Sequence, residues 1–337
     1  MGRRLPCPIC GGHQGLPVLG YDRGPADLFA FLDLPGPASE WTVCAGCGFV
    51  FQNPRPTPDR IVALYASGRY RARRHYSEHF FRMRYRNPLD HIRWFRHHVP
   101  DARPRSVIDI GAGHGGAVRA FRDLGVEAEG VELDPELVAS ARARFGVELI
   151  AGDFLTQAQP PAAYDLVYSS HTHEHFDDFV AANQKIHRLL KPGGHLLLVL
   201  PTHRCVARNG RGFLNVVHNS IFTARSLRNM LVQSGFEPVA FRYPMEHSRP
   251  EVWGIGRRAD GVPVDIKPDW PALVRWEIHY APYIFDVLYR VTDVPVRAAR
   301  ALERRAADET ARELFWNGGH PSRLALARAL VRAVRGR

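Results

Sequence analysis

The chain has 337 residues, 45% of them hydrophobic, and a formal net charge of +11. This length can hold one large domain and a smaller module, and this composition suits a globular protein with a buried core. No apolar run approaches the roughly 20 residues that a membrane-spanning helix needs. The N-terminus also lacks an apolar signal region, so we expect a cytoplasmic protein that does not enter a membrane.

The basic residues are almost all arginines, and they are dense between Arg55 and Arg105. Such a region could attract nucleic acid, a phosphorylated substrate or a nucleotide sugar. A solvated helical face explains the same residues equally well. The charge therefore leaves nucleic acid open as a partner without requiring it.

Residues 1–53 contain two short cysteine motifs. Cys7 and Cys10 form the first Cys-x-x-Cys-Gly motif, and Cys44 and Cys47 form the second. Each motif directs two thiolates toward one ion, so the pair predicts a zinc ribbon with one structural Zn²⁺. Disulfides are rare in the cytoplasm, and a redox dithiol is the remaining alternative.

Residues 54–100 are expected to form a linker followed by a helical segment. Pro54, Pro56 and Pro58 argue against a helix at the start, and Asp59 is placed to cap the helix that follows. Aromatic side chains recur through this region at Tyr65, Tyr70, Tyr76, Phe80, Phe81 and Tyr85. Aromatics at helical spacing are ordinary core residues in most proteins, and a cover over a ligand pocket is the functional alternative.

From residue 101 to 245 the sequence alternates strand and helix patterns, which predicts a doubly wound α/β sheet of the Rossmann type. We expect strands at residues 107–110, 128–132, 147–150, 166–169, 195–200 and 236–243. Asp134, followed by Pro135, should cap a helix that ends at Gly146. Thr223 should start a helix that Gly235 stops.

A glycine-rich turn follows the first of these strands, and it predicts a site for an adenosine-containing cofactor. Gly111 and Gly113 lack β-carbons, so a ligand can approach the backbone closely. Glu132, at the end of the next strand, can accept hydrogen bonds from two ribose hydroxyls. The glycines alone also satisfy the dinucleotide pattern. Asp109 favours a different ligand from a pyrophosphate. Its negative charge would repel a pyrophosphate, whereas it would attract the ammonium group of a methionine moiety.

Together with Asp153 after the third strand and the late turn-and-strand segment 189–201, these motifs resemble class I S-adenosylmethionine-dependent methyltransferases over roughly residues 100–245. The resemblance implies that S-adenosylmethionine is the cofactor and that the helical part of residues 54–100 is a cover over its pocket. It also implies that the cofactor-binding residues are Asp109, Gly111, Gly113, Glu132, Asp153 and Ser170. In this family the acid matching Asp153 lies against the adenine amino group. A nicotinamide enzyme is the alternative.

The catalytic candidates follow the strand at residues 166–169. His171, His173, Glu174 and His175 would lie beside the methyl donor, where histidine suits a general base. Glu174 and His175 resemble a motif of small-molecule methyltransferases, some of which hold a divalent ion at this loop. Here His171 replaces the expected acid. A general base or substrate contact, a metal site and purely structural hydrogen bonding all stay open.

The connection after residue 201 supplies a second set of candidates. His218 precedes Phe222 and Thr223 in a pattern that recurs in the resembling family, so we include it among the catalytic residues. Arg208 and Arg211 could hold a carboxylate or phosphate, although a surface loop explains them as well.

Residues 246–337 fit the sheet pattern poorly and are expected to form a mainly helical extension. The zinc-ribbon start combined with the methyltransferase motifs resembles bacterial sugar and natural-product methyltransferases. We therefore expect O- or C-methylation of a small molecule such as a sugar, a nucleotide sugar or a natural-product intermediate. An RNA base methyltransferase and a catalytically degenerate zinc-bearing scaffold are the alternatives. The acceptor and the oligomeric state cannot be read from the sequence.

Overall fold

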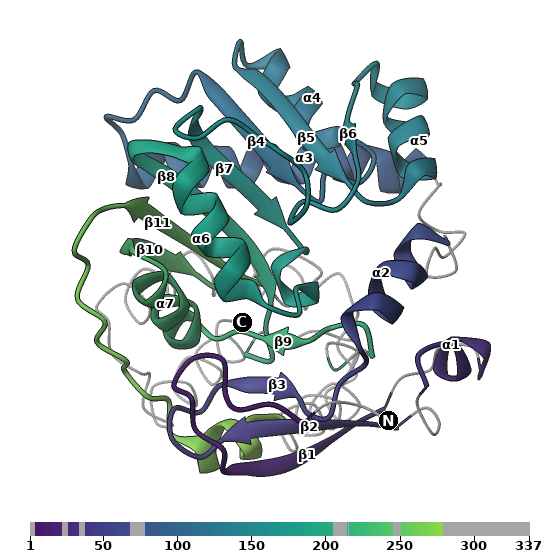
Figure 1. Ribbon diagram of the computed structural model, residues 1–337. Coiled ribbons are helices and arrows are strands. Elements are labelled where there is room, and N and C mark those ends of the chain that lie inside the picture. Colours follow the sequence, from purple (N-terminus) through teal and green to yellow (C-terminus); the bar gives the residue numbers. More distant parts are fainter. Residues whose placement is uncertain are drawn as a thin grey trace, which may run out of the picture.

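The computed structural model describes residues 4–21, 26–33, 38–67, 78–204, 214, 216–244 and 251–278. The described residues form two sheets, of which the larger has seven strands (Figure 1). In spatial order these are β10 (Phe236–Arg242), β11 (Glu251–Arg258), β8 (Leu190–Pro201), β7 (Tyr164–Ser170), β4 (Ser106–Ile110), β5 (Glu127–Glu132) and β6 (Ile150–Ala151).

The main sheet is mostly parallel. β8, β7, β4, β5 and β6 pair in parallel, and β11 runs antiparallel to both of its neighbours. The doubly wound Rossmann-like sheet expected from the sequence is confirmed. The strand order reverses on either side of β4, and ligands bind in such sheets at the carboxyl end of the strands around this reversal.

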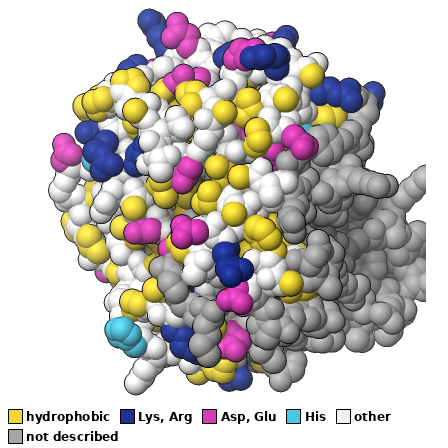
Figure 2. Space-filling model, turned by 45° about the vertical axis from the view of Figure 1, so that its right-hand side comes forward, with side chains coloured by type: hydrophobic (Ala, Val, Ile, Leu, Met, Phe, Trp, Pro, Cys, Tyr) yellow, Lys and Arg dark blue, Asp and Glu magenta, His cyan; other side chains and the backbone are white. Residues whose placement is uncertain are grey.

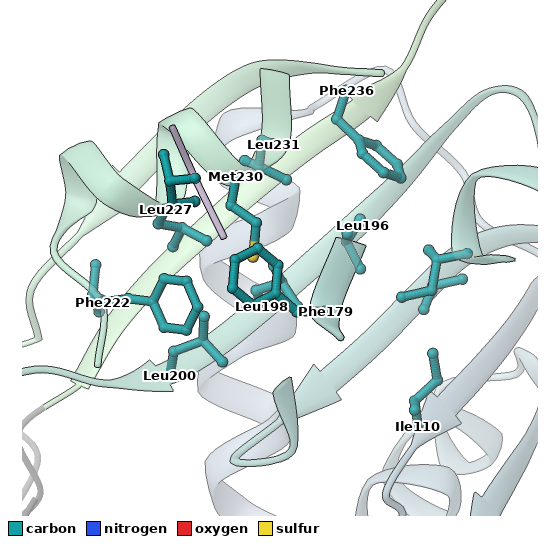
Figure 3. Packing of buried hydrophobic residues seen from close by; sticks show 14 of the residues in the cluster. Ile110, Phe179, Leu196, Leu198, Leu200, Phe222, Leu227, Met230, Leu231 and Phe236 are labelled. Carbon is teal, nitrogen blue, oxygen red and sulfur yellow. The ribbon is translucent and has the colours of Figure 1, made fainter. Parts of the chain in front are cut away.

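Helices cover both faces of this sheet. α3 (Glu78–His98) and α4 (Gly116–Asp123) pack on one face, and α6 (Phe179–Leu189) and α7 (Ala224–Gln233) on the other. Along β8, Leu197 and Val199 face the first pair, whereas Leu196, Leu198 and Leu200 face the second (Figure 3). This alternation is the period-two pattern of a strand that is buried on both faces.

Several helix ends follow the expected local chemistry. The Asp134 side chain accepts a hydrogen bond from Glu136 N, Pro135 opens α5 (Pro135–Phe145), and Gly146 ends it in the left-handed conformation. Thr223 and Ser226 form a capping box at the start of α7. The start of α2 (Pro58–Ala66) differs from the prediction, because Thr57 is the N-cap residue and Asp59 lies in the first turn.

The smaller sheet joins distant parts of the chain. β1 (Gly15–Tyr21), β2 (Ala38–Cys44) and β3 (Val50–Gln52) come from the N-terminal segment, which also contains the short helix α1 (Ala26–Phe31). The fourth strand, β9 (Ser220–Ile221), follows the main-sheet strand β8 in sequence and pairs antiparallel with β3 (Figure 1). The N-terminal segment is thus built onto the larger domain.

The prediction for the start of the C-terminal extension was also wrong. Residues 251–258 were assigned to a helical extension, yet they form β11, which lies between β10 and β8 in the main sheet. Gly254 and Gly256 weaken the strand pattern, because glycine has low strand propensity. Both are required for packing, since a β-carbon would come within 2.6 Å of Leu227 at Gly254 and within 2.8 Å of Leu231 at Gly256.

The chain beyond β11 runs back along α7 to the smaller sheet, and residues 271–278 are helical. None of the helices that the structure describes has the length and apolar character needed to cross a bilayer. Several sequence predictions lie outside the described residues. These are the extension beyond residue 278, the aromatic residues Tyr70 and Tyr76, and the connection residues Arg208 and Arg211.

Candidate active site

The glycine turn lies directly after β4. Gly111, Gly113 and Gly115 all have positive φ angles, of 73°, 56° and 75°. A β-carbon at Gly111 would lie 2.1 Å from Thr172 Oγ1, whereas at Gly113 it would meet no atom within 4 Å. Gly111 therefore lets the turns after β4 and β7 pack together, and Gly113 leaves open space above the backbone.

Glu132 fixes the far side of this turn. Its carboxylate is buried at the end of β5 and accepts hydrogen bonds from Gly113 N at 2.7 Å and from Asp134 N at 2.9 Å. Burial raises the pKa of Glu132, and the two backbone donors oppose that rise. The carboxylate is thus held against the glycine turn, at the place where the sequence predicts a ribose.

Asp109 lines a cavity beside β4, where the strand order of the main sheet reverses. The cavity is lined by Asp109, Gly111, Ser170 and His171, by Arg84 on α3, and by Glu251 on β11, among others. Burial raises the pKa of Asp109 to about 8, while the positive charge of Arg84 opposes the rise. A cation bound beside Asp109 would stabilise its ionised form.

Asp153 lies after β6, at the opposite end of the predicted cofactor site. One of its side-chain oxygens accepts a hydrogen bond from Leu155 N at 3.0 Å, which shapes the loop locally. Ser170 ends β7 and lines the cavity beside His171. The predicted cofactor residues thus lie at the carboxyl ends of four adjacent strands, as a ligand spread along this edge requires.

His171 is held between two buried carboxylates. Its Nε2 lies 2.9 Å from Glu251 Oε1, and its Nδ1 lies 3.5 Å from Glu174 Oε1. Burial would lower the pKa of His171, but the two carboxylates outweigh burial and raise it. The backbone of His171 has a φ of 55°, which non-glycine residues rarely adopt. The residue that makes these contacts thus carries local backbone strain.

Glu174 is fully buried in the short 3₁₀ turn His173–His175. Its side-chain oxygens accept no hydrogen bond from the described residues. Burial would raise the pKa of Glu174, but the charges of His175, His171 and His218 lower it to about 2. The carboxylate is therefore held ionised while these imidazoles carry a proton, with His171 Nδ1 at 3.5 Å and His175 Nε2 at 3.7 Å from Glu174 Oε1.

The hydrogen bonds of His175 determine which tautomer forms when the ring is neutral. Nδ1 lies 2.9 Å from the carbonyl oxygen of Val217 and 2.9 Å from the hydroxyl of Tyr65. A carbonyl oxygen can only accept, so Nδ1 carries the proton. Nε2 is left with its lone pair, 3.7 Å from Glu174 Oε1. This arrangement suits a base, because the carboxylate would stabilise the imidazolium that forms on proton transfer.

His173 has different surroundings from the other two histidines of the turn. It is fully buried, and its ring nitrogens contact Ser169 Oγ at 2.9 Å and Asn183 Oδ1 at 3.2 Å. Burial lowers the pKa of His173 to about 4, so the ring is neutral at physiological pH. Its contacts are those of a structural histidine that joins β7 to α6.

His218 meets the turn from the other side. Its ring centre lies 4.9 Å from that of His175. Ligating atoms of Glu174, His175 and His218 all lie within 4.8 Å of one another, so these three residues could hold a divalent ion as an alternative to acid–base chemistry.

The four N-terminal cysteines converge as the sequence predicts. Cys7 Sγ lies 3.6 Å from Cys47 Sγ, and Cys10 Sγ lies 3.5 Å from Cys44 Sγ. A tetrahedral Zn²⁺ about 2.3 Å from each sulfur would space the sulfurs at about 3.8 Å, and a disulfide at about 2 Å. The four residues therefore fit a zinc ion.

Three site residues escaped the sequence analysis. Glu251 lies on β11, the strand that was not predicted, and Tyr65 was noted only as one of several aromatics. Arg84, which lines the cavity, was one arginine among many in its region. No local motif marks these residues, because each reaches the site from a separate element that only the tertiary fold brings there.

Comparison with known proteins gives one family. Residues 75–240 match the model of a family described as a methyltransferase domain. The chain is 27% identical over 192 residues to a probable tocopherol O-methyltransferase of Oryza sativa subsp. japonica, covering 52% of this chain and 50% of that protein. It is 34% identical over 106 residues to a ubiquinone biosynthesis O-methyltransferase of Xanthomonas campestris, covering 30% and 43%.

The chain spans about half the length of the curated relatives it matches. Among solved structures it is similar to a 1,6-didemethyltoxoflavin-N1-methyltransferase of Burkholderia thailandensis, with 18% identity and a TM-score of 0.45, covering 63% of this chain and 96% of that one.

Proposed function

Residues 75–240 belong to the methyltransferase domain family, and on this premise we propose that the chain transfers a methyl group from S-adenosylmethionine to a small molecule. The observation that supports this function best is the junction of two sites. Asp109 and Gly111, next to the turn that Glu132 holds, line a cavity together with Ser170 and with His171, the first residue of the His171–His175 turn. A methyl donor and an acceptor would meet between the two turns.

The residues of the donor side fit S-adenosylmethionine. Glu132 would accept the ribose hydroxyls, Gly113 leaves room for the ligand, and Asp153 would contact the adenine. Asp109 and Arg84 line the cavity together and offer opposite charges to an amino acid, whose ammonium and carboxylate groups they would pair with. When bound, this cofactor supplies an activated methyl group.

The residues of the acceptor side would remove a proton. The bound cofactor would supply its methyl group to an acceptor oxygen or carbon and would keep the electron pair of the broken carbon–sulfur bond. The acceptor proton passes to His175 Nε2, and the charge of Glu174 stabilises the imidazolium. Tyr65 and Val217 hold the ring in position through Nδ1.

We infer that the acceptor is a sugar, a nucleotide sugar or a natural-product intermediate. The named relatives include small-molecule methyltransferases. On the face drawn in Figure 2, Lys and Arg side chains are interspersed with Asp and Glu and do not form one basic stripe. Within the arginine-dense region, Arg55 is almost fully buried and pairs with Asp177 at 3.1 Å. These features fit a small acceptor better than RNA.

The proposed function is tested with His175→Ala and, as a matched control, the exposed histidine variant His97→Ala. Acceptors are screened by release of S-adenosylhomocysteine, with nucleotide sugars, phenolic natural products and RNA as separate groups. Loss of a positioned general base should lower turnover about a hundred- to ten-thousandfold. S-Adenosylmethionine affinity should stay within about threefold, because His175 contacts the acceptor side only.

Full turnover of the His175→Ala variant would remove this residue from the mechanism. Activity that chelators abolish and added divalent ions restore would favour a metal at Glu174, His175 and His218. Methylation confined to RNA would favour the nucleic-acid acceptor, and no donor binding at all would favour a scaffold.

A further inference from the structure

The residues 217–221 connect the zinc ribbon to the turn that carries His175. At one end of this segment, β9 pairs with β3 through Val50 with Ile221 and Phe51 with Ser220. Gln52 N also donates a hydrogen bond to the carbonyl oxygen of Asn219 at 3.0 Å. β3 follows the second cysteine motif directly, and Cys44 N donates to the carbonyl oxygen of Phe49 at 2.8 Å.

The same segment holds the His173–His175 turn from the other side. Asn219 N donates to the carbonyl oxygen of Glu174 at 2.6 Å, and Asn219 Nδ2 donates to the carbonyl oxygen of His175 at 2.8 Å. Val217 supplies the carbonyl oxygen that fixes the His175 tautomer. One short segment therefore sets both the backbone of the turn and the orientation of its imidazole.

We propose that the zinc ribbon is the scaffold of the acceptor side of the active site, and that Asn219 is the positioning residue through which it holds His175. This inference rests on the proposed function for the role of His175. The Glu174 carboxylate accepts no hydrogen bond from the described residues, so the position of Glu174 depends on backbone contacts such as the one from Asn219 N. A second link runs in parallel, where the buried Arg55 after β3 pairs with Asp177 at 3.1 Å.

The packing of the ribbon supports the same coupling. Phe49 lies between the second cysteine motif and β3, and its ring centre is 5.9 Å from that of Phe179 and 5.3 Å from that of Phe222. Phe179 begins the helix after the catalytic turn, and Phe222 follows β9. The ribbon therefore contacts both elements that border the acceptor side. The donor side, by contrast, is built on β4 and β5 of the main sheet.

The test uses the full chain with Asn219→Ala, the isosteric Asn219→Asp, and Asn229→Ala as a matched control. Asn229 is also a buried asparagine whose side chain binds a backbone segment. Its Nδ2 donates to the carbonyl oxygen of Lys267 at 2.8 Å, and its Oδ1 accepts from Lys267 N at 3.0 Å. Zinc content is measured by metal analysis, S-adenosylmethionine affinity by calorimetry, and the His175 tautomer by ¹⁵N NMR, assigned with His175→Ala.

Asn219→Ala should retain one zinc per chain and donor affinity within about threefold, while the His175 population shifts away from the Nδ1–H tautomer. Turnover should fall about ten- to a hundredfold, because a base displaced by about 1 Å loses this much. Asn219→Asp should not restore the tautomer, since a carboxylate cannot donate to the His175 carbonyl oxygen. Asn229→Ala should keep the wild-type tautomer.

Zinc removal provides a second measurement on the same coupling. In the zinc-depleted protein, and in Cys10→Ser, amide hydrogen exchange should increase more at residues 173–175 and 217–221 than at β4 and β5. An unchanged tautomer in Asn219→Ala, or exchange that does not respond to zinc, would overturn the proposal. If the wild-type protein does not bind S-adenosylmethionine, the proposed function fails, but the tautomer and exchange results still decide the role of the ribbon.

Discussion

The three histidines of the His171–His175 turn differ because each has different neighbours. His171 contacts Glu174 and Glu251, His173 contacts Ser169 and Asn183, and His175 contacts Tyr65 and Val217. The sequence places all three beside the donor but cannot rank them. Their partners come from β11, α6, α2 and the segment before β9, and no local pattern links those elements to the turn.

The ion pair between His171 and Glu251 should make stability depend on pH. Burial opposes ionisation of Glu251, but His171 and the Trp253 side chain lower its pKa to about 2 from an ordinary 4.5. A carboxyl whose pKa is lowered on folding stabilises the protein above its unfolded pKa, and this contribution is lost as the pH falls toward the folded value. Acid should therefore weaken the pair progressively.

We predict that Glu251→Gln loses about 3–5 kcal/mol of unfolding free energy at neutral pH, as expected when one partner of a buried ion pair is removed. Between about pH 6 and pH 3.5 its deficit relative to the wild type should shrink by about 1 kcal/mol. Urea unfolding at several pH values measures this difference. A deficit that does not change with pH would mean that Glu251 acts by packing alone.

At the scale of elements, the sequence predicts what local chemistry determines. Asp134, Pro135 and Gly146 delimit α5, and Thr223 starts α7. The sequence analysis misses β11 and β9, because these strands form only by pairing with residues that are distant in the sequence. β11 pairs antiparallel with β10, and its glycines leave room for Leu227 and Leu231 of α7. β9 has only two residues, too few for any pattern to appear.

The packing of the turn after β4 against the turn after β7 predicts the effect of Gly111→Ala. Its β-carbon would collide with Thr172, and the positive φ of 73° adds backbone strain. Gly125→Ala is the matched control, because Gly125 has a φ of 77° and no atom within 4 Å of the added β-carbon. Both variants should lose about 1–2 kcal/mol of stability from the strain.

Only Gly111→Ala should also weaken S-adenosylmethionine binding, because the collision with Thr172 would displace the glycine turn. We expect a loss of about tenfold or more in affinity, which corresponds to about 1.4 kcal/mol. Thermal unfolding and calorimetry separate the two effects. Equal affinities for the two variants would show that the Gly111–Thr172 contact does not shape the donor site.

At the scale of the whole molecule, the ribbon and the methyltransferase sheet share one hydrophobic core. Cys7, Cys44, Phe49 and Phe51 belong to the same buried cluster as the residues of α6 and α7. The sequence places the ribbon in a separate module of residues 1–53, because its cysteine motifs are local. The chain after β11 extends this union, since Asp269 N donates to the carbonyl oxygen of Cys47 at 3.0 Å.

The central claim is that the glycine turn and Glu132 bind S-adenosylmethionine. Calorimetric titration of the full chain tests it directly, with Glu132→Ala and, as a control from the exposed start of the same strand, Glu127→Ala. The wild type and Glu127→Ala should bind one equivalent with equal affinity. Loss of hydrogen bonds to a charged group should weaken Glu132→Ala by about 1.5–3 kcal/mol, or about ten- to a hundredfold. Binding of NADH without S-adenosylmethionine, or equal affinity in all three proteins, would contradict the claim.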